Sequence, residues 1–279
     1  MPRSGVQETA QRKRQTNSGD PESKANDGSE HKPKSRSKST LARSSTSKPE
    51  STAAKKLARH ETLLTFEREL WAENKLVAGI DEAGAGPLAG PVTAACVILD
   101  PAQTDLLVGV DDSKRLSAKA RTRLATLIET HALAYAVAHA SVEEIETINI
   151  RQAGILAMQR AFDAASQVLK KGRTHSRPLR AHASVDHILI DARRLPIETE
   201  QTELIKGDAR SLSIAAASIL AKVSRDALML AADEAFPIYG FCRNMGYGTP
   251  EHLRALEAHG ASPFHRKTFE PVRSLCSRN

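Results

Sequence analysis

The chain has 279 residues and a formal net charge of +7; 40% of its residues are hydrophobic and 26% are charged. This length allows one large domain or two small ones with a substantial core. The three cysteines are odd in number and form no CxxC pair, which argues against a disulfide framework and against a zinc site. We therefore expect a protein of the reducing cytoplasm.

The first 50 residues form a compositionally distinct segment. They contain no Phe, Trp, Tyr, Ile or Cys, and their 11 Lys and Arg against 6 Asp and Glu carry +5 of the net charge. Such a segment buries too little apolar surface to offset the entropy lost on ordering. We expect a disordered basic arm over 1–57 and one folded domain over 58–279. The arm either binds phosphate backbones nonspecifically or is a solvated low-complexity extension. It lacks the apolar core of a signal peptide, and we expect no export.

The first elements after the arm are a helix and a pair of strands. Leu, Phe and Trp recur at helical spacing in ARHETLLTFERELWAE, which predicts a short helix over 58–73. KLVAGID (75–81) and VTAACVIL (92–99) are short, β-rich and separated by a Gly/Pro turn, so we expect consecutive strands. A helical segment over 117–132 then leads to a third strand over 134–142.

The second half alternates helices and strands. Apolar residues at helical spacing predict a helix over 148–170, followed by a polar loop. HILI before Asp191 reads as a buried strand, TELI (202–205) before Lys206 reads as a fifth strand, and a long helix begins near Ser211. A last helix over 250–260 precedes a short irregular tail. A strand pair followed by alternating helices and strands indicates a mixed sheet flanked by helices.

Three acidic residues stand in similar surroundings. Asp81, Asp191 and Asp208 each follow an apolar, β-like run. Strands that end at one edge of a sheet would bring these carboxylates together, where α/β sheets tend to place ligands. Because like charges in close contact repel, such a cluster needs a cation. Oxygen ligands without Cys or His favour Mg²⁺ or Mn²⁺. The alternative is that these are separate turn residues.

The adjacent pair Asp81 and Glu82 requires a further condition. Neighbouring residues on a strand point to opposite faces, so both acids can face one site only if the strand ends there. Gly84 and Gly86 would permit that sharp departure, since glycine takes positive φ without strain. Asp208 stands three residues before the expected helix cap Ser211, where a helix N-terminus favours an ionised carboxylate.

Several segments, taken in chain order, resemble the ribonuclease HII family. GIDEAGAGPLAGPV (79–92) is similar to its opening signature, and DSKRLS (112–117) is similar to its second motif. KGDARSLSIAAASILAKVSRD (206–226) is similar to its most distinctive motif, and MGYGTPEH and HRKTF resemble its C-terminal motifs. The resemblance covers roughly residues 60–275 and leaves out only the arm.

The resemblance implies an α/β, RNase H-like fold: a central mixed five-stranded sheet flanked by helices, with a C-terminal helical segment. It implies a ribonuclease H that hydrolyses RNA in RNA·DNA hybrids and single ribonucleotides embedded in DNA duplexes. Metal-assisted in-line attack would leave a 3′-hydroxyl and a 5′-phosphate. The cofactor would be one or two Mg²⁺ or Mn²⁺ ions, with no membrane and no obligate protein partner. Carried over by motif, the catalytic and metal-binding residues are Asp81, Glu82, Asp191 and Asp208. The candidate substrate-binding residues are Gly84, Ala85, Gly86, Ser113, Lys114 and Tyr247.

This chain departs from the family's pattern at two places. The family's Gly-Arg-Gly turn, which contacts the 2′-hydroxyl, reads Gly84-Ala85-Gly86 here, so the guanidinium is missing while the backbone groups remain. Asn244 and Met245 stand where the family usually has His and Lys. Both changes remove positive charge from the expected substrate side and predict weaker or altered binding, which the basic arm could offset.

Other interpretations stay open. Tyr247, between two glycines, either stacks on a sugar or packs within a loop. Lys114 and Lys222 either contact phosphates or are ordinary solvated lysines. Asp226, inside the long helix, is interpreted as structural and paired with a nearby base. The chain could also be an RNase H-like enzyme acting on DNA structures, or, because Ala85 replaces an arginine, a nucleic-acid-binding protein that has lost catalysis.

Overall fold

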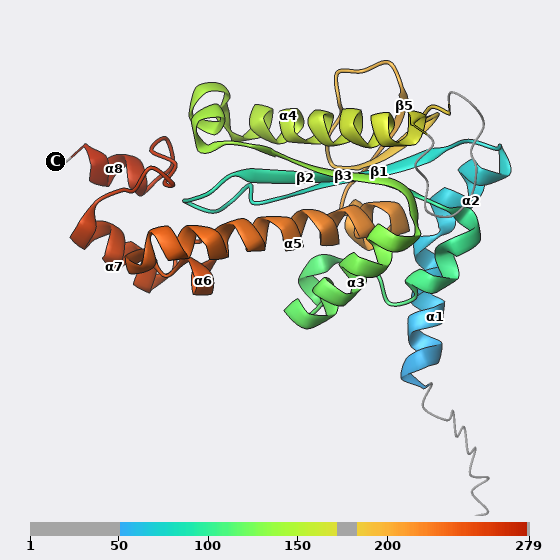
Figure 1. Ribbon diagram of the computed structural model, residues 1–279, viewed down its shortest axis with the longest axis horizontal. Helices are drawn as coiled ribbons and strands as arrows, with labels where there is room; N and C mark the ends of the chain where they lie inside the picture. Colours follow the sequence, from blue (N-terminus) through green and yellow to red (C-terminus); the bar gives the residue numbers. More distant parts are fainter. Residues whose placement is uncertain (1–50, 172–182, 278–279) are drawn as a thin grey trace, which may run out of the picture. The chain divides into compact units, whose positions relative to one another are not determined.

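A computed structural model describes residues 51–171 and 183–277 of the chain (Figure 1). The elements, in chain order, are α1 (Thr52–Leu63), α2 (Thr65–Ala72), β1 (Val77–Ala83), β2 (Val92–Leu99), η1 (Pro101–Leu107), η2 (Ser113–Arg115), α3 (Ala118–His131), β3 (Ala132–Ala140), α4 (Val142–Lys170), β4 (His187–Asp191), β5 (Glu200–Leu204), η3 (Gly207–Ala209), α5 (Leu212–Ala235), η4 (Pro237–Tyr239), α6 (Phe241–Asn244), α7 (Pro250–His259) and α8 (Val272–Cys276). The elements named η are 3₁₀ helices.

The five strands form one mixed sheet in the order β3-β2-β1-β4-β5. Strands β1, β2 and β3 pair antiparallel, as consecutive hairpin strands do, whereas β4 and β5 join β1 in parallel. The predicted α/β fold with a mixed five-stranded sheet and flanking helices is confirmed. The central position of β1 places the segment after residue 79 next to both the antiparallel and the parallel half of the sheet.

Helices cover both faces of the sheet. Figure 1 shows α4 along one face and α5 with α3 along the other. Strand β2 is buried along its whole length, because its alternate residues pack into two separate cores. Cys96 and Ile98 join the core under α4, and Val97 and Leu99 join the core under α5 and α3. This explains why VTAACVIL is apolar at every position but Thr93 instead of alternating.

One glycine brings helix α5 directly onto β1. A Cβ atom added at Gly79 would overlap the backbone of Ser213 in the first turn of α5. The N-terminus of α5, which follows η3 and its Asp208, therefore lies against the strand that carries Asp81 and Glu82. Close packing of helix on strand thus brings residues more than 120 positions apart in the chain to one edge of the sheet.

Some predicted boundaries were wrong. Helix α1 begins at Thr52 with Ser51 as its N-cap, so the end of the predicted arm over 1–57 is helical; the arm's first 50 residues lie outside the described ones. Helix α4 begins at Val142 instead of at residue 148, and Asn149, at φ 67°, separates this first helical part from the second, which the Asn149 side chain caps. The C-terminal tail, predicted as irregular, contains α8. Among the described residues, none of the helices combines the length and apolar character that a bilayer crossing requires.

Candidate active site

The two adjacent acids lie inside strand β1, not beyond its end. Pairing with β2 continues through Glu82 and Ala83, whereas pairing with β4 stops at Ile80 opposite Ile190. The prediction that the strand ends at the acids was wrong, because the hairpin with β2 holds β1 extended for three more residues. Over residues 81–83, the edge of β1 that faces β4 is unpaired, and Asp81 and Glu82 lie there.

Asp81 and Glu82 extend opposite faces of β1. Glu82 follows the face of Ile80 toward α4, and its Oε1 forms an ion pair of 2.7 Å with Nη2 of Arg193. Asp81 follows the face of Gly79 toward α5; it is 5% exposed, and its Oδ1 accepts the N–H of Glu82 at 2.7 Å. Both carboxylates therefore flank the strand edge from opposite sides.

Burial raises the pKa of Asp81 well above its usual value, and the negative charges of Glu82, Asp191 and Asp208 raise it further. Burial also raises the pKa of Glu82, while the guanidinium of Arg193 opposes that shift. Because Glu82, Asp191 and Asp208 all disfavour ionisation of Asp81, the structure places these three other predicted acids within electrostatic reach of Asp81.

Asp191 and Asp208 are fixed by a turn between β4 and α5. Asp191, the last residue of β4, accepts the N–H of Gly207 on Oδ1 at 2.6 Å. Lys206, at φ 56°, reverses the chain before η3, and Asp208 in η3 is 4% exposed. Nζ of Lys114 lies 3.3 Å from Oδ2 of Asp208. Asp208 therefore lies in a short 3₁₀ turn after β5. The prediction that Asp208 directly follows a strand was wrong.

The donor set of this site is compatible with a hard divalent cation. All four carboxylates offer oxygen, and Oε2 of Glu82 is buried without a hydrogen-bond partner among the described residues. Within the same residues, the side chains as they stand do not place three acidic, imidazole or thiol groups closely enough to enclose an ion. The cluster has unsatisfied negative charge that a cation would neutralise, with rotamer changes needed to close around it.

Two buried arginines hold the glycine turn after the acids. Arg266 is fully buried, and its guanidinium donates to five main-chain carbonyls. Those acceptors belong to Gly84, Ala85, Pro87, Gly90 and Pro91. Arg225, 1% exposed, donates to the carbonyls of Ala89, Pro91 and Met245. Burial and the adjacent Arg225 lower the pKa of Arg266 to about 9. The turn therefore directs its carbonyls inward, to the arginines.

Only one of the two glycines flanking Ala85 has the conformation expected of both. Gly84 has φ +94°, and a Cβ there would overlap the side chain of Arg225. Gly86 does not have a positive φ; a Cβ there would lie 3.8 Å from Cε1 of Tyr247. Neither backbone conformation nor lack of space therefore requires glycine at position 86. Gly86 lies where the turn borders the ring of Tyr247.

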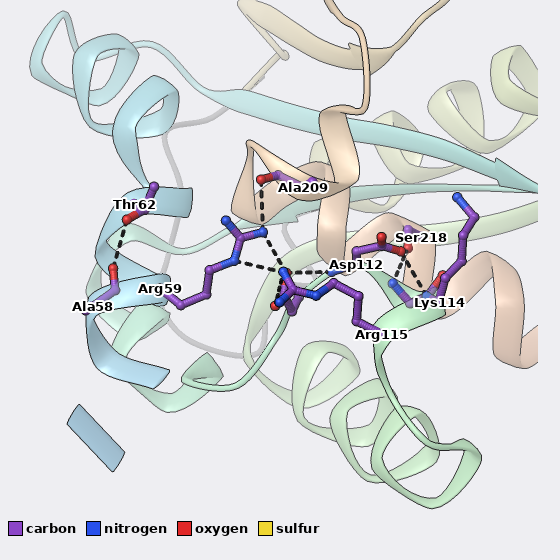
Figure 2. Close-up of polar contacts among 10 residues, drawn as sticks. Ala58, Arg59, Thr62, Asp112, Lys114, Arg115, Ala209 and Ser218 are labelled. Atoms are coloured by element: carbon purple, nitrogen blue, oxygen red, sulfur yellow. Dashed lines mark hydrogen bonds and ion pairs between the residues drawn. The ribbon is translucent and has the colours of Figure 1, made fainter. Parts of the chain in front are cut away.

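The remaining predicted substrate residues differ in exposure. Tyr247 is 48% exposed, and the Lys114 side chain is 82% exposed, so both are available to a ligand. Ser113 is buried, and its N–H donates to Oγ of Ser218 at 3.2 Å (Figure 2). Lys222 pairs with Asp226 at 2.6 Å. The predicted pairing of Asp226 with a nearby base is confirmed, since Asp226 contacts both Lys222 and Arg121.

Asn244 and Met245 do not face the presumed substrate side. Asn244 is buried; it donates to the carbonyl of Tyr239 at 2.7 Å and accepts from Gly246 at 2.8 Å. Met245 packs against the small core that contains Phe241. The Asn244 and Met245 side chains present in this chain thus pack within the loop.

Sequence reasoning missed Arg193, Arg225 and Arg266. A signal existed for Arg225: it stands four residues from Ala221 and four from Met229 on the buried stripe of α5, where an arginine needs internal acceptors. Arg193 and Arg266 have no comparable signal, because their partners come from distant segments.

The mixed sheet with acids gathered at one edge defines a nuclease of RNase H-like fold. A model of the family described as Ribonuclease HII matches residues 78–272. Ribonuclease HII 1 of Methylibium petroleiphilum is 51% identical over 205 residues, which cover 73% of this chain and 94% of the relative. Ribonuclease HII of Geobacillus kaustophilus is 46% identical over 218 residues, 78% of this chain and 77% of the relative. The chain belongs to the ribonuclease HII family and is a ribonuclease H, an endoribonuclease of the hydrolase class.

Solved structures show the same fold at lower sequence identity. Ribonuclease H2 from Pyrococcus horikoshii OT3 aligns with a TM-score of 0.57 and 24% identity, covering 72% of this chain and 97% of that chain. Bst-RNase HIII in complex with Mn²⁺ aligns with a TM-score of 0.57 and 20% identity, covering 73% and 70%. These likenesses concern the fold alone.

Proposed function

We propose that this enzyme hydrolyses the RNA strand of RNA·DNA hybrids and the phosphodiester at single ribonucleotides embedded in duplex DNA. One observation carries the proposal: buried Asp81 lies within electrostatic reach of three other carboxylates, supplied by β1, β4 and η3. Nothing in packing alone requires so much like charge at one edge of a sheet, and it costs folding free energy. Binding of divalent cations for phosphodiester hydrolysis would explain why the chain keeps this destabilising cluster of like charges.

Asp81, Glu82, Asp191 and Asp208 are proposed to hold one or two Mg²⁺ or Mn²⁺ ions. When bound, such ions lower the pKa of the attacking water and stabilise charge on the leaving oxygen. The protein's own part is to hold carboxylates in place: the Gly207 N–H binds Asp191, and the Arg193 guanidinium pairs with Glu82. Water adds to phosphorus, the bond to the 3′-oxygen breaks, and that oxygen takes a proton. The products are a 3′-hydroxyl and a 5′-phosphate.

The turn of Gly84, Ala85 and Gly86 is proposed to contact the ribose 2′-hydroxyl. In a trans peptide the N–H points opposite to the carbonyl. Because Arg266 binds the carbonyls of Gly84 and Ala85, the N–H groups of Ala85 and Gly86 point away from it. Donors that point away from Arg266, on a turn whose Gly86 borders the Tyr247 ring, suit a sugar hydroxyl beneath a stacked aromatic.

Lys114 is proposed to contact a phosphate while it neutralises Asp208, and Ser113 is proposed to hold the Lys114 loop through its backbone. The segment before α1 is proposed to be the basic arm, which adds nonspecific affinity for phosphate. If so, removal of that segment makes binding less dependent on salt.

A cleavage assay with three duplexes tests the proposal. The substrates are DNA with one ribonucleotide, a continuous RNA·DNA hybrid, and all-DNA of the same sequence, each with Mg²⁺ or Mn²⁺. The expected result is cleavage of the first two, with 3′-hydroxyl and 5′-phosphate ends. Cleavage of the all-DNA duplex would favour an enzyme for DNA structures, and binding without cleavage would favour a protein that has lost catalysis; either result overturns the proposal.

A further inference from the structure

Arg59 of helix α1 reaches the two segments that carry Lys114 and Asp208 (Figure 2). Its Nη2 donates to Oδ1 of Asp111 at 2.7 Å and to the carbonyl of Ala209 at 2.9 Å, and its Nε donates to the same Asp111 oxygen at 3.1 Å. Ala209 is the residue after Asp208, and Asp111 stands three residues before Lys114. One guanidinium thus joins the same two segments that the Lys114–Asp208 ion pair joins.

A relay of hydrogen bonds connects Arg59 to Lys114. Oδ1 of Asp111, held by Arg59, accepts the N–H of Asp112 at 2.9 Å, and Oδ1 of Asp112 accepts the N–H of Lys114 at 2.9 Å. Arg115 contacts the other oxygen of Asp111 at 3.2 Å, but its side chain is 61% exposed. The side chains of Arg59 and Asp111 are 27% and 16% exposed, so their contact is less screened by water than a surface pair.

Anchoring α1 does not by itself require Arg59. Leu63 and Leu64 are buried in the core under α5. In the next helix, the buried Glu67 accepts hydrogen bonds from Oγ of Ser211 at 2.5 Å and from the N–H of Ser213 at 2.8 Å. The helix pair is therefore held by apolar burial and by a second polar contact. Arg59 also lies outside residues 78–272, which the family model matches.

We propose that Arg59 is a positioning residue: it sets the distance between Lys114 and Asp208. Arg59 does so from helix α1, which lies outside the residues that the family model matches. The proposal rests on the proposed function, since it assigns those two residues to substrate and cation. Loss of the guanidinium leaves the Asp111 carboxylate and the Ala209 carbonyl without their shared donor, so the two segments can separate. A displacement of about 1 Å from such a change can lower a rate up to roughly a hundredfold.

The test compares Arg59→Met with Arg68→Met in the full-length chain. Arg68 lies on α2 and forms an exposed ion pair with Glu61, away from the two segments, so it is the matched control. For Arg59→Met we expect kcat on a single-ribonucleotide duplex to fall roughly ten- to a hundredfold. We also expect severalfold more Mg²⁺ or Mn²⁺ to be needed for half-maximal activity, whereas Arg68→Met should match the wild type in both measurements.

Hydrogen exchange without added metal provides a readout independent of activity. In Arg59→Met, amides over 111–116 and 206–210 should exchange faster, while those of α4 should stay protected as in the wild type. Wild-type kinetics and wild-type hydrogen exchange in Arg59→Met would overturn the proposal. A loss of activity that is fully accounted for by a lower global stability of the variant would overturn it as well. If Arg59→Met does not fold, Asp111→Asn must show the same defects, or the proposal is wrong. A wild-type enzyme that cuts no ribonucleotide substrate would instead refute the proposed function.

Discussion

Replacement of Gly84 by alanine would test whether Arg225 shapes the glycine turn. The new Cβ would have two separate costs. It would sit on a residue with φ +94°, which costs a non-glycine residue on the order of 1–3 kcal/mol. It would also overlap Cδ and Nε of Arg225, a buried side chain that cannot swing away because it donates to three carbonyls.

Overpacking of this kind costs about 1–3 kcal/mol more, so we expect Gly84→Ala to destabilise the fold by about 2–6 kcal/mol in total. Gly109→Ala is the matched control. Gly109 has φ +104°, but an added Cβ there meets nothing within 4 Å. It should therefore cost only the backbone strain, about 1–3 kcal/mol, and the difference between the two variants isolates the overlap with Arg225.

Urea unfolding followed by circular dichroism measures both variants, with cleavage of a single-ribonucleotide duplex measured below the transition. Gly84→Ala should lose stability and, where still folded, activity, because the shifted Arg225 releases the carbonyls of Ala89, Pro91 and Met245. Equal destabilisation by Gly84→Ala and Gly109→Ala would refute the reasoning, since the side-chain overlap would then contribute nothing.

Three further predictions concern the carboxylates, the turn and a buried histidine. Asp81→Asn should lower cleavage at least about a hundredfold without destabilising the metal-free protein, since burial and three carboxylates raise the pKa of Asp81; retained activity would contradict its metal role. Ala85→Arg should increase kcat/KM on a single embedded ribonucleotide, and an unchanged or lower value would count against that role for the side chain. Burial and His252 lower the pKa of His265 to about 4, so stability should be constant above pH 6.5 and fall by about 3 kcal/mol toward pH 4. Urea titrations over that range should show a shallower dependence for His265→Asn, and equal slopes would exclude His265 as the source.

Two strands of the sheet could be predicted from the sequence because they are buried and short. VTAACVIL and HILI are almost entirely apolar, which is typical of a strand between two layers, and both are strands in the structure. Two boundaries failed for local reasons. The first half of α1, TAAKKL (52–57), has too few apolar residues to distinguish it from the arm, although Ser51 caps it. Asn149 divides α4, so that its first two turns lose the period of the rest.

The candidate site divides into parts that leave a trace in the sequence and parts that do not. Carboxylates after apolar runs are visible as a pattern, and Asp81 does lie within electrostatic reach of the other three acids. The groups that hold the turn are different, because Arg266 binds main-chain carbonyls, which every residue has. The acceptors of a buried guanidinium cannot be inferred from residue types, whereas its burial can be suspected from an apolar helix face, as for Arg225.

The structure separates two contributions of the glycine turn that the sequence leaves merged. The direction of its N–H groups depends on Arg266, which binds the carbonyls of Gly84 and Ala85, while Arg225 holds the later carbonyls of Ala89 and Pro91. The side chain at position 85 contributes nothing to that arrangement, because only the carbonyl of Ala85 is bound from within. Absence of the family's arginine should therefore weaken the hold on the substrate but leave recognition of the 2′-hydroxyl intact. Selectivity for ribonucleotides would then depend on the buried arginines more than on residue 85 itself.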